Sequence, residues 1–518
     1  MNYIQGTSRE QLTLFPTCLD SAIATTNEVR QIDSFVNSLD MKELGFTNAK
    51  PASEGRPAYN PADLLKLFIY GYLNRTRSSR ELEKETKRNI EVIWLLKGLQ
   101  PDHNTISNFR RDNPDAIKKV FAKTVNIAHN HNLIGGIILA GDSVKLRAQN
   151  SKKNNYNADK VKRHQEYIDK KLEEYTNQLA QADNDTQRQD AEKQIDKYKS
   201  RKIKYQKIEK QLEETGASQI STSDPDSRQM IVRNNITEVA YNIQTINDAK
   251  HNIILNYETT QNNDTHALAQ MVQSAIPIVG HNNFIALFDK GYHTGSEIAA
   301  CHQMGVETMV AVPARPISSQ SPHPAYNYEA FTYNTETDTY TCPTGQVLHT
   351  NGTLYTSKTS NFKQYKTPQC KTCEQRNLCT LAKQNGRIVQ RSEHIENVER
   401  NRKMVESNPE LYKKRQAIVE HPYGTIKRQW GFDHIMIKRY KTRVSADVGL
   451  IFVAYNLRRL INILCTKDTK GVCFVFYAKM RSKISHFKTI KKFIINTIIF
   501  QIQKIIPCNQ LYLHQAVC

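Results

Sequence analysis

Up to about residue 130, apolar residues recur at the three- and four-residue spacing of amphipathic helices. The clearest run opens with Asn60-Pro61, a helix cap followed by a proline, and has apolar residues at positions 64, 65, 67, 68 and 72. Further helices are expected to begin near Ser78-Ser79 and to cover Asn89 to Leu96. The pattern predicts an all-α amino-terminal domain over residues 1–130.

A polar and basic stretch, Pro101 to Arg111, closes this region. A turn followed by a polar helix start is what a helix-turn-helix protein presents to DNA, with Arg110 and Arg111 as candidate contacts. An ordinary helical bundle with solvated basic residues accounts for the same pattern equally well. The sequence leaves both interpretations open.

From about residue 135 the apolar period changes to two, which is typical of strands. Positions 138, 140, 142, 144 and 146 fall on one strand face, and all are apolar except Asp142. A carboxylate on an apolar face needs a reason, and ion binding is one. A buried aspartate satisfied by backbone donors is the alternative.

More strands and helices alternate after this point. Strands are expected at 239–249, 252–260 and 306–312, and helices at 264–278 and 296–304. The solid apolar run before Asp289 is typical of a central strand, and it puts Asp289 at the carboxyl end, where open α/β sheets bind ligands. The resulting order, β-β-β-α-β-α-β within residues 131–465, is that of a ribonuclease-H-like domain.

Two insertions and a tail complete the expected organisation. Residues 151–222 are rich in Lys, Glu and Gln with sparse apolar positions, which favours a solvated helical hairpin over a long coiled-coil dimer. Residues 320–400 form a Cys-rich insertion, and residues 466–518 form a tail of alternating basic and apolar clusters.

The net charge changes the picture of possible partners. The chain has 72 Lys and Arg against 51 Asp and Glu, a formal charge of +21. Such an excess favours a polyanionic partner, because each Lys or Arg on a phosphate releases condensed counterions, although a basic surface alone is the plainer explanation.

The amino terminus does not resemble a signal peptide, and no run of ~18 apolar residues predicts a membrane span. A cytoplasmic location is expected.

Four of the 10 cysteines gather in the Cys-rich insertion: Cys342, Cys370, Cys373 and Cys379. Cys370 and Cys373 form a C-x2-C pair, so the four thiolates could make a tetrahedral zinc site. Reduced cysteines in a loop-rich insertion are the alternative, and the sequence leaves both open.

Near the end of the chain, Glu420, Tyr423 and Lys427 have the spacing of one helix face. Pro422 disfavours helix at His421 and is expected to kink or restart the helix just after Glu420. Five other carboxylates compete for the role of a metal-binding acid: Asp224, Asp226, Asp248, Glu406 and Glu410. All but Glu406 have a structural explanation as turn, hairpin or helix-start residues.

Three segments in order carry a resemblance to a known family: Asp142 on its strand, Asp289-Lys-Gly-Tyr292, and Glu420-His-Pro-Tyr-Gly-Thr-Ile-Lys427. They resemble the DDE transposases of bacterial insertion sequences, from about Arg9 to about Leu464. The resemblance implies that Asp142, Asp289 and Glu420 are catalytic. It also implies DNA-contacting roles for Tyr412, Arg415 and Lys427, although four residues separate Arg415 from Glu420 where three are usual. Tyr423 and Arg428 in the same segment are further candidate DNA contacts.

The resemblance further implies a ribonuclease-H-like catalytic domain and an amino-terminal domain that contacts DNA ends. Two Mg²⁺ (or Mn²⁺) ions on the three carboxylates would serve cleavage of double-stranded DNA at terminal inverted repeats and joining to target DNA. Pairing of two ends implies a homodimer. A nuclease without strand transfer and an inactive DNA-binding regulator are the alternatives.

Overall fold

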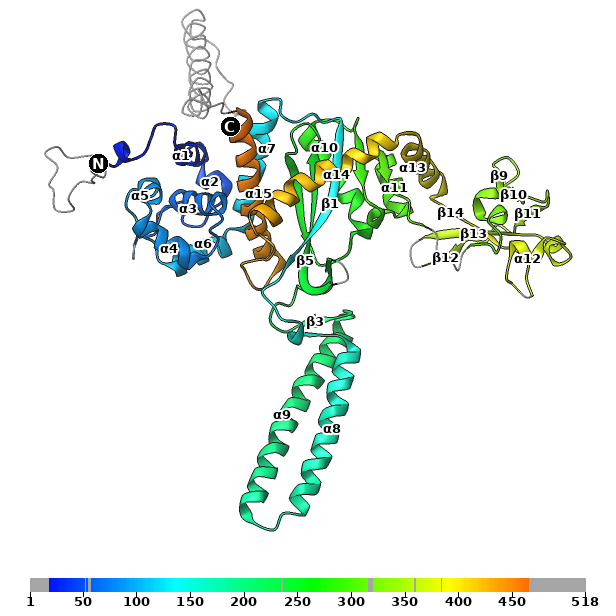
Figure 1. Cartoon of the computed structure of the whole chain (residues 1–518), viewed down its shortest axis with the longest axis horizontal. Helices are drawn as coiled ribbons and strands as arrows, with labels where there is room; N and C mark the ends of the chain where they lie inside the picture. Colours follow the sequence, from blue (N-terminus) through cyan, green and yellow to red (C-terminus); the bar gives the residue numbers. More distant parts are fainter. Residues whose placement is uncertain are drawn as a thin grey trace, which may run out of the picture. The chain divides into compact units, whose positions relative to one another are not determined.

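The computed structural model describes residues 18–464, apart from 52, 55–56, 234–235, 315–319, 358–359 and 383. The expected tail, 466–518, lies outside these residues. The chain divides into two units (Figure 1). One comprises the described residues up to Phe109 together with 457–464, and the other comprises Arg110–Asn456. The division falls at Phe109, and the next helix along the chain, Pro114–Asn130, packs on the strand Ile254–Thr260 of the second unit.

The first unit is helical, as the apolar spacing predicts. Asn60 caps its longest helix by accepting a hydrogen bond from the Ala62 N–H at 2.9 Å, and Pro61 occupies the first turn. The rings of Phe46 and Phe68 both stack on Phe109 in the core. The helices are α1 (Val29–Asn37), α2 (Met41–Leu44), α3 (Pro61–Leu73), α4 (Ser79–Arg88), α5 (Ile90–Leu95) and the start of α6 (His103–Asp112).

A mixed sheet forms the centre of the second unit. Its strands run in the order β4-β5-β1-β7-β8, with β6 also paired to β5. The β1 strand is antiparallel to β5 and parallel to β7, and β7 is parallel to β8. The strands are β1 (Ile138–Arg147), β4 (Arg228–Arg233), β5 (Ile236–Asp248), β6 (Ile254–Thr260), β7 (Ile285–Phe288) and β8 (Glu307–Val310). The expected combination of a helical amino-terminal region and a sheet-containing region is confirmed.

Helices flank this sheet. Ile418 and Val419 of α14 pack on Ala140, Leu287 and Met309 of three neighbouring strands. The helices are α7 (Pro114–Asn130), α10 (Leu268–Val279), α11 (Gly295–Gln303), α13 (Ile395–Ser407), α14 (Pro409–Tyr423) and α15 (Lys441–Leu464). A π-helical segment, Gly424–Gln429, continues α14 past Pro422, so the helix widens after Tyr423 where a break was expected after Glu420. No described helix is long and apolar enough to cross a membrane.

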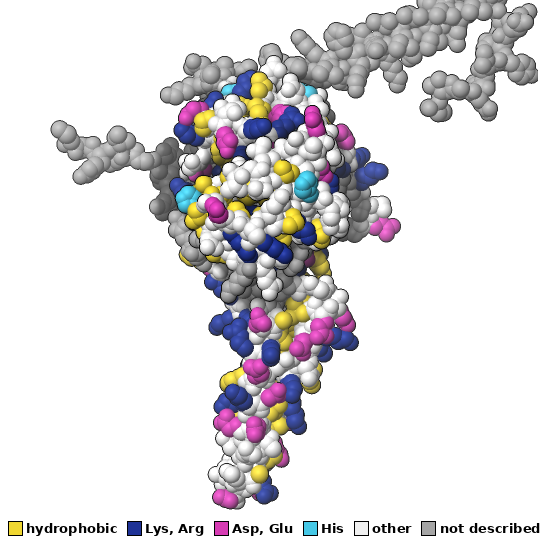
Figure 2. All heavy atoms as spheres, turned by 90° about the vertical axis from the view of Figure 1, so that its right-hand side faces the viewer, with side chains coloured by type: hydrophobic (Ala, Val, Ile, Leu, Met, Phe, Trp, Pro, Cys, Tyr) yellow, Lys and Arg dark blue, Asp and Glu magenta, His cyan; other side chains and the backbone are white. Residues whose placement is uncertain are grey.

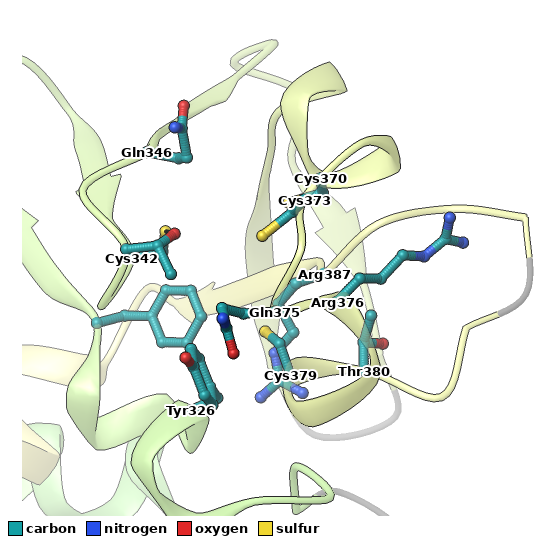
Figure 3. Close-up of a pocket in the computed structure, with 12 residues that line it drawn as sticks. Tyr326, Cys342, Gln346, Cys370, Cys373, Gln375, Arg376, Cys379, Thr380 and Arg387 are labelled. Carbon is teal, nitrogen blue, oxygen red and sulfur yellow. Dashed lines mark hydrogen bonds between the residues drawn. The ribbon is translucent and has the colours of Figure 1, made fainter.

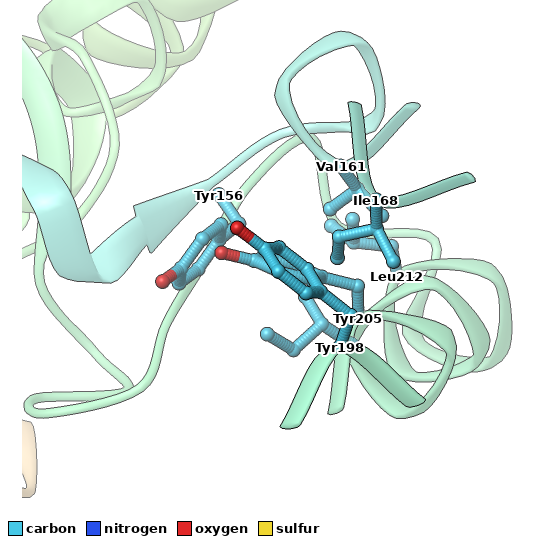
Figure 4. Packing of buried hydrophobic residues seen from close by; sticks show 7 residues of the cluster. Tyr156, Val161, Ile168, Tyr198, Tyr205 and Leu212 are labelled. Atoms are coloured by element: carbon cyan, nitrogen blue, oxygen red, sulfur yellow. The ribbon is translucent and has the colours of Figure 1, made fainter. Parts of the chain in front are cut away.

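Two long helices lie between β1 and β5 in the sequence. They are α8 (Ala158–Ala180) and α9 (Asp185–Thr215), which run side by side (Figure 1). Short strands β2 (Asn155–Tyr156) and β3 (Ile220–Ser221) pair at their base. Aromatic and aliphatic side chains join the two helices, among them Tyr156, Ile168 and Tyr205 (Figure 4). Their outer faces carry interspersed acidic and basic side chains (Figure 2), as expected of a solvated hairpin.

A second, smaller sheet occupies the Cys-rich region, for which the sequence analysis predicted no strands. Its strands are short and its core has five buried residues: Phe331, Tyr340, Leu348, Tyr365 and Val389. The elements are β9 (Thr332–Asn334), β10 (Thr339–Thr341), β11 (Val347–Thr350), β12 (Tyr355–Thr356), β13 (Asn361–Lys366), β14 (Val389–Ser392) and helix α12 (Arg376–Cys379). We call residues 326–392 the cysteine module.

Candidate active site

Asp142 in the middle of β1 and Asp289 just after the end of β7 belong to adjacent parallel strands. The pairing of the two strands ends at Ala140 and Leu287, and each aspartate follows two residues later in the chain. Neighbouring strands lie about 4.8 Å apart. Close packing at this point requires Gly141, because a Cβ there would lie 2.0 Å from the Phe288 ring. The two aspartates therefore lie near each other, and the charge of Asp289 acts on Asp142.

The Asp142 carboxylate is mostly buried and has two partners. Its Oδ1 accepts a hydrogen bond from the Ser143 N–H at 2.7 Å, and its Oδ2 lies 3.1 Å from Nη1 of Arg415. Burial raises the pKa of Asp142 above its usual value, Arg415 opposes the rise, and the charge of Asp289 adds to it. The site therefore resists holding a second negative charge without a cation.

Asp289 follows β7 and begins a short turn. Its side chain accepts a hydrogen bond from the Gly291 N–H at 2.8 Å, which fixes one carboxylate oxygen. Asp289 is half-buried, and the neighbouring Phe288 carbonyl accepts a hydrogen bond from the Tyr412 hydroxyl at 2.9 Å. Helix α14 is thereby attached beside Asp289.

Further polar contacts attach α14 and the π-helical segment to β1. The Tyr423 hydroxyl donates to the Asp142 carbonyl at 2.9 Å and lies 2.6 Å from Oγ1 of Thr245. Nζ of Lys427 donates to the Lys145 carbonyl at 3.2 Å. Tyr412, Arg415 and Tyr423 thus face β1 and β7, so the two tyrosine hydroxyls expected on DNA are engaged within the protein.

Glu420 lies at the flank of this helix face. It follows the buried Val419 by one position, a rotation of about 100° around the helix. The Glu420 side chain is exposed, and its Oε1 accepts a hydrogen bond from Gln416 at 2.9 Å. Glu420, Tyr423 and Lys427 line one cleft of about 480 Å³, as their spacing predicts, and the other charged residues around it are Lys145, Arg147, Arg428 and Asp433.

A half-buried carboxylate that the sequence did not single out, Asp264, lies next to this cleft and pairs with its lining residue Lys145. Asp264 accepts hydrogen bonds from the side-chain amides of Asn242 at 2.8 Å and Gln244 at 2.7 Å, and it forms an ion pair with Lys145 at 3.3 Å. Burial opposes ionisation, but Lys145 and the two amides outweigh it and hold the pKa of Asp264 below its usual value. Asp264 comes from a turn after β6, and no local motif marks it.

Asp264 is also close to Asp289. A Cβ on Gly291 would lie 3.0 Å from Oδ1 of Asp289 and 3.5 Å from Oδ2 of Asp264. Gly291 thus separates two carboxylates, and a larger residue would push them apart. Even so, among the described residues no three His, Cys, Asp or Glu side chains are close enough together to hold a metal ion as they stand. Glu420 in particular is not gathered with Asp142 and Asp289 in this conformation.

Other acidic candidates have structural roles. Asp248 is fully buried and accepts hydrogen bonds from the Gly135, Gly136 and Lys250 N–H groups, so backbone donors satisfy it. Asp224 is likewise buried and accepts from the Tyr241 hydroxyl at 2.7 Å. Glu410 is exposed and pairs with Lys413 on the outer face of α14.

Arg110 and Arg111, the two candidate DNA contacts on α6, differ in exposure. Arg110 is buried and its Nη1 lies 3.4 Å from Asp447, so the expected DNA contact by Arg110 would require breaking a buried ion pair. Arg111 is exposed and pairs with Asp112 at 2.6 Å. The structure therefore favours Arg111 over Arg110 as a surface contact.

The four cysteines of the cysteine module lie around one pocket (Figure 3). All four are free thiols and partly exposed. Cys342 comes from the turn after β10, and the other three come from the segment that includes α12. The sequence grouping of these residues thus corresponds to a spatial grouping.

Two family models match the chain. A transposase domain (DUF772) matches residues 17–112, which include the helices of the first unit. A transposase DDE domain matches residues 341–461, which include α14 with Glu420. Asp142 and Asp289 lie between the two matches. No curated protein and no solved structure matches the chain significantly. The two models, matched in this order along one chain, bear out the resemblance and support a DDE-class insertion-sequence transposase.

Proposed function

We propose that this transposase binds the terminal inverted repeats of its own element, cuts the 3′ ends and joins them to target DNA. The observation that supports the proposal is that Asp142 in the middle of β1 and Asp289 just after β7 belong to adjacent parallel strands, with the matched DDE helix α14 hydrogen-bonded to both strands. The strand order supports a ribonuclease-H-like assignment. Without β4, the sheet has the spatial order β6-β5-β1-β7-β8. Numbered by their order in the chain, these five strands read 3-2-1-4-5, and strands 1, 2 and 3 are antiparallel to their neighbours among themselves.

The three carboxylates suit hard divalent cations. Oxygen ligands are what Mg²⁺ and Mn²⁺ prefer, and Asp142, Asp289 and Glu420 would hold two ions. When bound, such ions activate a water or a DNA hydroxyl and stabilise the leaving oxygen. For Asp142 to take part, its Oδ2 has to be released by Arg415, and Glu420 has to turn from Gln416 toward Asp142 and Asp289.

The protein's own groups position the DNA. Lys145, Arg147, Lys427 and Arg428 line the cleft beside Glu420, where a phosphodiester backbone would find cations on both walls. Asp264 holds Lys145 in place. No side chain has to act as a nucleophile. Joining of two ends in one complex supports a homodimer as the active assembly.

An assay on a plasmid with terminal repeats tests the proposal. Purified protein with Mg²⁺ or Mn²⁺ should nick the 3′ ends of the repeats and give joined products with a second plasmid. Cleavage without joined products would instead identify a nuclease. Repeat binding without any cleavage would identify a DNA-binding regulator.

A further inference from the structure

The cysteine module has a small hydrophobic core. Five buried residues form its centre, and its longest strand, β13, has six residues. Small domains often gain stability from an added cross-link such as a disulfide or a metal. Its four cysteines are free thiols, so no disulfide supplies that cross-link.

The four thiols are arranged around a single small cavity. Its volume is about 20 Å³, enough for one small ion or water, and it is lined by Cys342, Cys370, Cys373 and Cys379. Figure 3 shows Cys342 on one side and Cys373 and Cys379 on the other. The sulfurs line the cavity without meeting at one point, so an ion would have to draw them inward by a side-chain movement.

The backbone around two of the cysteines is tightly built. The Cys342 N–H donates to the Gln346 carbonyl at 2.9 Å, and the Gly345 N–H donates to the Cys342 carbonyl at 2.9 Å. Gly345 has a φ of +83°, which a residue with a Cβ adopts only with strain. On the other side, a Cβ on Gly386 would lie 2.1 Å from the Cβ of Cys370, so only glycine allows this approach.

The electrostatic surroundings fit thiolates in a cluster. Two cations, Arg376 and Arg387, line the same pocket and offset negative charge there. Four thiolates without a cation would repel, whereas a divalent cation would neutralise half of their charge.

We propose that Cys342, Cys370, Cys373 and Cys379 bind one structural Zn²⁺, which fastens the 370–379 segment to the β10–β11 turn. Zinc is the metal that four thiolates in a tetrahedral structural site typically select. Because the four thiolates fill all four coordination positions, none is left for a water or a substrate, and the ion has no catalytic role. The site is independent of the proposed carboxylate centre.

Metal analysis of the full-length protein, purified without added metal, tests the proposal. We expect one zinc per chain, and Cys373→Ser should lose at least half of it. Cys301→Ser is the matched control, because Cys301 is a free thiol buried in α11 outside the module, and it should keep the full content. Zinc that is absent from the wild type, or unchanged in Cys373→Ser, would overturn the proposal.

A second measurement on the wild type keeps the test independent of how the variant folds. With zinc bound, four thiols should resist alkylation until a chelator is added, and cobalt substitution should give the visible spectrum of a tetrahedral thiolate site. Four thiols that react at once, or iron with acid-labile sulfide in place of zinc, would contradict the assignment. Neither readout depends on DNA cleavage, so failure here leaves the transposase proposal standing.

Discussion

Arg415 on α14 forms an ion pair with Asp142 on β1, with Nη1 and Oδ2 3.1 Å apart. The two side chains are only 18% and 24% exposed, so the interaction is poorly screened by solvent. The pair links the helix matched by the DDE model to the strand that carries the first aspartate. It also occupies the carboxylate oxygen that a metal ion would need.

Replacement of Arg415 should separate these two effects. Arg415→Gln should lower the free energy of unfolding of the metal-free protein by about 2 kcal/mol at neutral pH, because a mostly buried carboxylate loses its cation. Burial raises the pKa of Asp142 and Arg415 opposes that rise, so removal of Arg415 should raise this pKa further. The loss of stability should therefore be largest at pH values where Asp142 is ionised, and it should shrink in acid. Added Mn²⁺ should then raise the melting temperature more in the variant than in the wild type.

Lys413→Gln is the matched control for this experiment. It removes the same charge from the same helix, but Lys413 pairs with an exposed Glu410. Its unfolding should differ little from that of the wild type. Equal melting temperatures and equal Mn²⁺ effects in all three proteins would show that the Arg415–Asp142 pair is not important for either property.

DNA binding should depend on the basic walls of the cleft. The net charge of +21 predicts a slope of several units when log Kd is plotted against log salt concentration. Lys427→Ala and Arg147→Ala should each weaken binding and reduce that slope by about 1, because each residue lines the cleft. Lys170→Ala, an exposed position on α8, changes the charge equally and should leave the slope unchanged if the cleft is the binding surface.

Asp264 and Lys145 should act as a unit. Asp264→Asn removes the charge that holds Lys145, so it should slow end cleavage about as much as Lys145→Ala does. The double variant should be little worse than either single variant, since paired residues are non-additive. Cleavage rates for the four proteins measure this coupling. Fully additive losses would mean that Asp264 does not position Lys145.

The cysteine module contains an ionisable group with a defined pH signature. Hydrogen bonds from Lys363, Tyr365 and Tyr333 lower the pKa of Asp338 to about 2 from its ordinary 3.8. The stabilisation from Asp338 is therefore present above pH 3.8 and is lost as the pH falls through about 2. Asp338→Asn should cost about 1 kcal/mol at neutral pH, a modest value because the group is partly exposed.

Thermal unfolding across pH checks this expectation. The difference in melting temperature between the wild type and Asp338→Asn should narrow as the pH drops from 4 toward 2. This is the range between the ordinary pKa of Asp338 and its lowered pKa in the folded protein. Glu336→Gln is the control, because it removes an exposed carboxylate from the same turn. A gap that stays constant, or one that widens in acid, would contradict the account of Asp338.

Much of the fold follows from local patterns, whereas the detailed site depends on tertiary packing. The Asn60-Pro61 helix start and the alternation around Asp142 each reflect a short-range rule, so the sequence predicts α3 and β1. The strands of the cysteine module were missed because they are two to six residues long and mostly half-exposed, which leaves little alternation to detect.

The same distinction applies to the site residues. Helical spacing places Glu420, Tyr423 and Lys427 together, and they do line one cleft. Spacing does not predict that Arg415 binds Asp142, because the rotation of α14 is set by the burial of Ile418 and Val419 against the sheet. The sequence does not predict a role for Asp264 for a similar reason, because its partners Lys145, Asn242 and Gln244 come from the distant strands β1 and β5.

The most direct test of the central claim is metal-dependent cleavage of repeat ends by single carboxylate variants. Asp142→Ala, Asp289→Ala and Glu420→Ala should each abolish Mg²⁺- or Mn²⁺-dependent cleavage and leave end binding nearly intact, because each removes an oxygen ligand and no basic residue. Glu410→Ala, on the exposed side of the same helix, should cleave normally. If all three variants cut like the wild type, the carboxylate centre is wrong; if only Glu420→Ala does, another residue is the third ligand.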